Sequence, residues 1–158
     1  MTLRGVFHAL PPGVFGCRIR TRADLANFVR GTHAIAPTAR LDLADTGDAL
    51  HALCIRLDLG EALGVQPLTI PGTVDARYLP AYRLPALAGR IESIAPGELA
   101  RALSRNAPTA PDTAVAADTG QLARQFLQLK RFLRDCATQR SDIVFARHDE
   151  SDDAPAPV

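Results

Sequence analysis

The ionisable side chains that could do chemistry are concentrated in one stretch, Leu41–Leu57 (LDLADTGDALHALCIRL), which contains Asp42, Asp45, Asp48 and His51. Asp48 and His51 are three residues apart, so a helix would place them on one flank. A carboxylate in that position can hold an imidazole in one tautomer, and such a pair can act as a general acid or base. Asp48 and His51 are therefore the candidate catalytic residues of this sequence.

A structural role explains the same two residues with fewer requirements. Asp48 can complete the N-terminal cap of the helix, and His51 can form a hydrogen bond at the border of the core. A catalytic triad would also need a nucleophile, and nothing in the sequence marks one. We therefore favour the structural interpretation over an enzyme.

Metal binding by this stretch is not expected. Carboxylate oxygens suit hard cations, but Asp42, Asp45 and Asp48 straddle a strand end and a helix cap, where they already have structural roles. The sequence contains neither a GxGxxG loop nor a Walker motif that would bind a phosphate group. It therefore predicts no metal and no cofactor.

A second candidate site lies in Ala76–Leu84 (ARYLPAYRL), which reads as a strand. Its potential binding residues are Arg77, Tyr78, Tyr82 and Arg83. Arginine and tyrosine are enriched where proteins bind partners. Pro80 inside the run predicts either an edge strand or a break in the strand, since proline cannot donate to a sheet ladder. An exposed edge can pair with another chain, so these four residues are the candidate binding surface and the edge is a candidate homodimer contact. Ordinary solvation with half-buried tyrosines is the simpler interpretation of the same residues.

Composition limits the classes of partner. The chain has 158 residues, enough for one domain, and 18 Lys plus Arg against 17 Asp plus Glu give a formal net charge of +1. This balance lacks the basic excess of a nucleic-acid-binding protein. No apolar run reaches the roughly 18 residues of a membrane span. We expect partners other than nucleic acid and membranes.

Cysteine spacing indicates the compartment. The three cysteines, Cys17, Cys54 and Cys136, are widely spaced and form no CxxC pair. An odd, scattered set argues against a disulfide framework and against a zinc site. We therefore expect a cytoplasmic protein.

Several elements can be predicted in the first half of the chain. Gly5–Leu10 reads as a strand that stops at a Pro-Pro-Gly breaker. Thr21 and Asp24 have the spacing of a capping box for a helix that ends at Gly31. The helix that begins within Leu41–Leu57 should be capped by Asp45 and end at Gly60 or Gly64. The following segment, 67–73, reads as a turn-rich connection.

The second half is predicted to be mainly helical. Pro85 and Pro96 should each begin a short helix, the first running to Ile94 and the second to Arg105. A loop is expected over Asn106–Ala117, followed by a capping box at Asp118. The next helix carries the strongest periodic signal, with Leu122, Phe126, Leu129, Leu133 and Cys136 on one face. Asp142–Arg147 reads as a final strand.

These elements together predict an α+β fold. Residues 1–147 should form a single domain in which a small, mostly antiparallel or mixed sheet packs against several helices. Those helices include a long C-terminal helix followed by the final strand. Residues 148–158 are rich in carboxylates and proline, and we expect a disordered tail there.

The order of these motifs resembles the YfbM-like family, a bacterial family of unknown function. The resemblance runs from Gly5 to about His148 and is carried by five segments: GVF, LDLADTGDALHAL, PLTIPGT, RLPALAGRIESIAPGELARAL and LARQFLQLKRFLRDCATQRSDIVFA. Asp48, Leu50 and His51 match the family's D-x-L-H motif, whereas Gly47 stands where the family usually has Trp. The resemblance implies an α+β fold and brings no activity, cofactor or catalytic residue.

Two functions are consistent with these observations. The first is a soluble protein that binds another protein; immunity proteins that act against toxins of neighbouring cells are an analogy for this role. The alternative is a small-molecule-binding protein or hydrolase that uses Asp48 and His51 together with Tyr78 or Tyr82. We favour binding of another protein.

Overall fold

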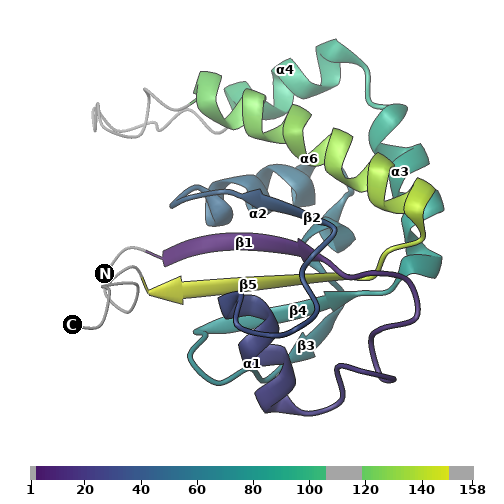
Figure 1. The fold of residues 1–158 in the computed structure, drawn as a ribbon. Coiled ribbons are helices and arrows are strands. Elements are labelled where there is room, and N and C mark those ends of the chain that lie inside the picture. Colours follow the sequence, from purple (N-terminus) through teal and green to yellow (C-terminus); the bar gives the residue numbers. More distant parts are fainter. Residues whose placement is uncertain (1–2, 106–118, 150–158) are drawn as a thin grey trace.

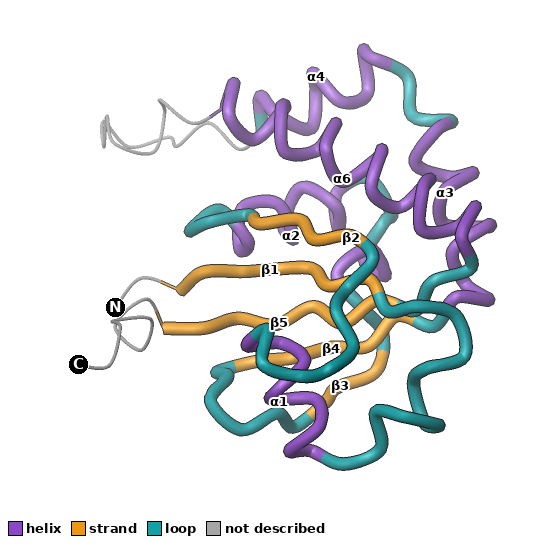
Figure 2. The backbone as a smooth tube through the Cα atoms, viewed as in Figure 1, coloured by secondary structure: helices purple, strands orange, loops and turns teal. Residues whose placement is uncertain are grey.

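Five strands form one antiparallel sheet in the computed structural model, which describes residues 3–105 and 119–149. The strands are β1 (Leu3–Ala9), β2 (Ala39–Asp42), β3 (Gln66–Leu68), β4 (Asp75–Leu79) and β5 (Ile143–Asp149). Their order across the sheet is β2-β1-β5-β4-β3 (Figure 2). The predicted strands near both ends of the chain are thus confirmed, and they pair with each other in the middle of the sheet.

Five α-helices and two short 3-10 helices pack around this sheet in the described residues. The α-helices are α1 (Arg22–Arg30), α2 (Gly47–Arg56), α3 (Leu84–Glu92), α4 (Pro96–Ser104) and α6 (Thr119–Gln139). The 3-10 helices are η1 (Gly60–Leu63) and η2 (Ala81–Arg83). In Figure 1, α3, α4 and α6 lie together, and α1 lies apart from them beside β4 and β5. The α+β fold class predicted from the sequence is confirmed.

Each face of the sheet has its own core, because successive side chains of a strand point to opposite faces. Phe7 and Phe145 contact one another, with ring centroids 4.7 Å apart, and pack in the larger core with α2, α3, α4 and α6. Val144 and Ala146 face the other side and pack against α1 in a smaller core. The sheet is therefore a middle layer that joins two packed faces.

The strongest local signals in the sequence are confirmed. Thr21 accepts a hydrogen bond from the backbone N–H of Asp24, whose carboxylate accepts from the backbone of Thr21, so the capping box is complete. The helix ends at Gly31, which has a φ of 79°, in the left-handed region that favours glycine. The apolar stripe of α6 is buried along its whole length. The two ends of α1 depend on interactions within a few residues.

The start of α2 differs from the prediction. The N-cap is Thr46 rather than Asp45, and its hydroxyl donates to the carbonyl of Leu43 and contacts Oε1 of Gln125. Gln125 also donates to Leu43, so this helix start is fastened to α6 rather than capped by a local carboxylate. The helix ends at Arg56, before the glycines that were expected to end it.

Of the two outcomes predicted for Pro80, the split of Ala76–Leu84 is observed, whereas the edge strand is not. β4 ends at Leu79 and pairs with β5 on one side and β3 on the other. The short strand β3, which carries Pro67, lies in the segment interpreted as a turn-rich connection. Tyr82 and Arg83 belong to η2 rather than to the strand. A homodimer through this edge would have to displace β3.

The remaining boundaries shift by small amounts. β5 continues through Asp149, two residues beyond its predicted end, so the strand takes in the first part of the predicted tail. The predicted loop at 106–117, the cap at Asp118 and the tail from 150 onward lie outside the described residues. No helix in the described part of the chain is long and apolar enough to cross a membrane.

Candidate functional site

Asp48, one of the two candidate catalytic residues, forms an ion pair with Arg147 of β5. The Arg147 side chain is only 15% exposed, and its guanidinium lies 5.7 Å from the centre of the Phe145 ring. Asp48 itself is 78% exposed at the start of α2. It therefore covers a guanidinium that is packed against an aromatic ring of the core.

His51 lies one helical turn further along α2 and is half-buried. Its Nδ1 is buried and has no hydrogen-bond partner among the described residues. Burial lowers the pKa of His51, and the positive charges of Arg77 and Arg147 lower it further. The carboxylates of Asp48 and Asp75 raise the pKa, but by less. The imidazole is thus biased towards its neutral form, which can accept a proton.

The carboxylate of Asp48 pairs with Arg147 and not with His51, the partner predicted from the sequence. Asp48 and His51 share a flank of α2, as predicted, but no hydrogen bond joins their side chains. A carboxylate that pairs with Arg147 is not positioned to fix the tautomer of His51. The catalytic role of Asp48 and His51 stays a prediction, and the ion pair with Arg147 supports a structural role for Asp48.

That role predicts a specific loss of stability. The substitution Asp48→Asn removes the charge that compensates Arg147, so we expect the free energy of unfolding to fall by about 1–2 kcal/mol, since solvent already screens the exposed carboxylate. Urea unfolding at neutral pH measures this change in the free energy of unfolding. The control is Asp135→Asn, because Asp135 pairs with Arg134 at 3.7 Å and both side chains are more than half exposed. Equal effects of the two substitutions would contradict the structural role.

The four predicted binding residues are divided among three places. Arg77 pairs with Asp75 at 3.7 Å on the face of the sheet that carries α2. Tyr78 points to the opposite face and stacks on Phe15, with ring centroids 4.2 Å apart. Burial, and then the neighbouring carboxylate of Asp142, raise the pKa of the Tyr78 hydroxyl. Arg77 and Tyr78 therefore do not form one surface.

Tyr82 and Arg83 do lie together, in an exposed network that we call the Tyr82 surface (Tyr82, Arg83, Glu61 and Arg90). Tyr82 is 79% exposed, and the guanidinium of Arg83 lies 6.0 Å from its ring centre. Glu61 accepts from Arg83 at 3.1 Å and from Arg90 at 3.4 Å. One carboxylate thus orders two arginines beside an exposed aromatic ring.

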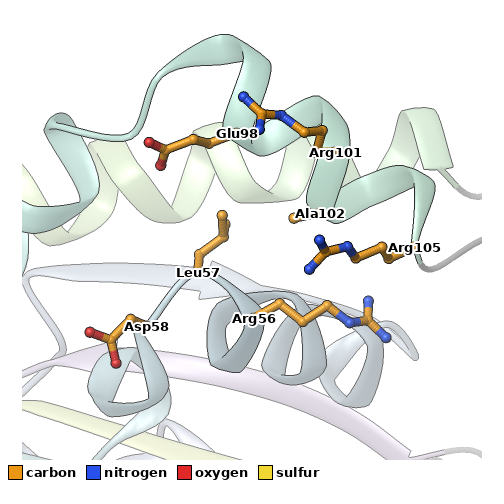
Figure 3. Close-up of a pocket in the computed structure, with 7 residues that line it drawn as sticks. All are labelled: Arg56, Leu57, Asp58, Glu98, Arg101, Ala102 and Arg105. Carbon is orange, nitrogen blue, oxygen red and sulfur yellow. The ribbon is translucent and has the colours of Figure 1, made fainter.

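A pocket between α2 and α4 was not predicted from the sequence. It has a volume of about 290 Å³, and its lining residues are Arg56, Leu57, Asp58, Glu98, Arg101, Ala102 and Arg105 (Figure 3). Arg90 of the Tyr82 surface donates to the backbone carbonyl of Asp58 at 3.4 Å. One hydrogen bond therefore links the Tyr82 surface to a residue of the pocket.

The acidic residues of Leu41–Leu57 do not assemble into a metal site. Asp42 binds the guanidinium of Arg4 and accepts from the backbone N–H of Ala44 at 2.9 Å. Burial raises the pKa of Asp42, but these hydrogen bonds hold it below its usual value. In residues 3–105 and 119–149, no group of three or more His, Cys, Asp and Glu side chains could hold a metal ion.

Comparison with known proteins identifies the fold. No family model matches the chain, and no curated protein sequence matches it. Among solved structures, the chain is similar to YfbM from Escherichia coli, which is described as a protein of unknown function. The similarity has a TM-score of 0.67 and covers 91% of this chain and 99% of the other, at 16% sequence identity. This confirms the predicted YfbM-like fold, and an identity this low carries no activity or site residue across.

Proposed function

For a chain with the YfbM-like fold, we propose a function in binding another protein, with the Tyr82 surface as the contact area. The observation that carries this proposal is the exposure of Tyr82, at 79%, next to the side chain of Arg83. Tyrosine and arginine dominate binding energy at protein interfaces, where a large flat ring and a planar cation contribute area and hydrogen bonds together.

Order in the free protein supports this choice of surface. Glu61 holds Arg83 and Arg90 through contacts of 3.1 and 3.4 Å, so two long side chains are partly fixed before a partner arrives. Binding then costs less conformational entropy than it would with unrestrained arginines. These ion pairs are exposed and contribute little to folding stability.

The proposal includes a cytoplasmic location. Cys54 and Cys136 are buried and unpaired, and burial raises the pKa of each thiol to about 12. Thiols held in their protonated form are unreactive towards disulfide exchange. A chain with free cysteines in its core is suited to a reducing compartment.

Quantitative capture from a lysate of the encoding organism tests the contact area. The tagged full-length chain is compared with the double variant Tyr82→Ala/Arg83→Ala and with the control Val74→Ala. Val74 is 55% exposed and precedes β4, at the opposite end of that strand from Tyr82. We expect one protein to be recovered stoichiometrically with the wild-type chain and the control, and recovery to fall at least about tenfold with the double variant.

Two results would contradict the proposal. One is that no protein is retained above background by the wild-type chain. The other is that the double variant retains its partner as well as Val74→Ala does, which would move the contact area elsewhere. A partner that the chain neutralises, as immunity proteins do with toxins, would be captured in the same way.

A further inference from the structure

We infer that the pocket between α2 and α4 binds an oxyanion, the phosphate or carboxylate group of a small ligand, through the guanidinium groups of Arg56 and Arg105. This inference is independent of the proposed protein partner, because it concerns a cavity rather than the Tyr82 surface. It assigns a ligand-binding site of defined chemistry to a part of the chain that no sequence motif marked.

The first argument is the state of the arginines that line the pocket. Arg56, Arg101 and Arg105 form no ion pair with any carboxylate in the described part of the chain, although Asp58 and Glu98 line the same cavity. Arg77 and Arg147 of the sheet, by contrast, have carboxylate partners. Arg56 and Arg105 therefore keep donors available for a ligand, whereas the Nε of Arg101 donates to the backbone carbonyl of Gly97 at 3.3 Å.

The second argument is the distribution of charge in the pocket. Figure 3 shows Arg105 reaching from α4 towards α2, on the same side of the cavity as the guanidinium of Arg56, while Glu98 and Asp58 lie towards the other side. Two neighbouring cations repel one another. An oxyanion between them would replace that repulsion by charge-assisted hydrogen bonds, which the planar guanidinium forms in pairs with phosphate and carboxylate.

Helix dipoles explain only part of this arrangement. Arg56 is the last residue of α2, and Arg105 caps the C-terminal end of α4, where a cation is favourable in any helix. The dipoles do not require the two side chains to line one cavity. The two side chains line one cavity because α2 packs beside α4. The apolar residues Leu57 and Ala102 line the same pocket.

The size of the pocket limits the ligand. A volume of about 290 Å³ lies at the small end of the range for ligand sites. It suits a ligand with one or two anionic groups rather than a dinucleotide or a long peptide. Leu57 and Ala102 can contact the carbon skeleton of such a ligand while the arginines bind its charge.

Titration of the full-length chain with two probes tests the inference. Pyrophosphate represents phosphate ligands and citrate represents carboxylate ligands. Binding is followed by calorimetry and by the NMR shifts of the Leu57 and Ala102 amides, at low ionic strength, where exposed charges are least screened. The double variant is Arg56→Gln/Arg105→Gln, and the control is Arg131→Gln, which removes an exposed arginine of α6.

We expect saturable binding of at least one probe, weakened at least about tenfold in the double variant and changed less than about twofold in the control. Binding of pyrophosphate alone would assign a phosphate ligand, and binding of citrate alone a carboxylate ligand. Absence of saturable binding with both probes would overturn the inference, as would equal weakening in the control. The variant Tyr82→Ala/Arg83→Ala should keep its probe affinity, so this inference and the proposed function can fail separately.

Discussion

Lowering the pH from about 6.5 to about 4 is expected to reduce the free energy of unfolding by about 3 kcal/mol through a single side chain, His8. His8 is 2% exposed on the α1 face of the sheet, and both ring nitrogens lack a hydrogen-bond partner among the described residues. Burial, followed by the charges of Arg40 and His148, lowers its pKa from 6.5 to about 4, and Asp42 opposes the shift only in part.

The sign follows from the two states. Between pH 6.5 and 4 the unfolded chain binds a proton at His8 that the folded chain does not, so acid favours the unfolded state throughout this window. Below pH 4 both states are protonated at this position and the effect is complete. Neutral His8 therefore contributes stability that is present above pH 6.5 and lost as the pH falls.

The variant His8→Leu isolates this contribution. Leucine keeps an apolar side chain against Phe28, whose ring centre lies 6.0 Å from that of His8. We expect the variant to match or exceed the wild-type stability at pH 7.5 and to lose about 3 kcal/mol less on acidification to pH 4, measured by urea unfolding across the range. The pKa of His51 is also lowered, but its effect is shared by both proteins and cancels in the difference. Parallel pH profiles of the two proteins would contradict the prediction.

The substitution Gly64→Ala should have a comparably large effect, about 3 kcal/mol or more of lost unfolding free energy. Gly64 has a φ of 107° and a ψ of 154°, a combination that side chains with a Cβ rarely adopt. A Cβ placed there would lie 2.5 Å from the Cβ of Arg77 and 3.2 Å from its carbonyl carbon. Neither atom is the end of a flexible side chain, so the backbone would have to move.

The same substitution should also disturb the Tyr82 surface. Gly64 ends η1, the segment that carries Glu61, and Glu61 holds both Arg83 and Arg90. The control is Gly89→Ala in α3, where a Cβ meets nothing within 4 Å and the φ is helical. Because alanine favours helices over glycine by about 1 kcal/mol, this control should leave stability unchanged or raise it. A Gly64→Ala protein as stable as the control would show that the turn can rearrange without cost.

The elements that the sequence predicted well depend on neighbours in the chain. Thr21, Asp24 and Gly31 fix both ends of α1 by contacts that span a few residues, and the spacing of Leu122, Phe126 and Leu129 specifies a buried face whatever lies opposite. The predictions failed where a residue distant in the sequence determines the local structure. Thr46 is tied to Gln125 across 79 residues, although a glutamine inside the apolar stripe of α6 was a visible signal of a buried polar contact.

The candidate site was harder to predict for the same reason. Asp48 meets Arg147 across 99 residues, and nothing near either residue marks the other as its partner. Arg56 and Arg105 come from separate helices, so their approach depends on how those helices pack. β3 was missed because its three residues include a proline, and its existence decides whether β4 is an edge. Residue types could nominate Tyr82 and Arg83, but only the fold could separate them from Arg77 and Tyr78.

The central position of β5 has a consequence for synthesis of the protein. β1 and β5 pair from Leu3–Asp149 to Ala9–Ile143, and β5 alone joins β1 and β2 to β4 and β3. A nascent chain that still lacks β5 therefore holds two separate strand pairs, β1–β2 and β3–β4, with no strand to join them. Such a topology has a high contact order, which slows folding. The apolar faces of both strand pairs stay uncovered until β5 is synthesised and pairs with β1 and β4, and a chaperone can bind these faces during that interval.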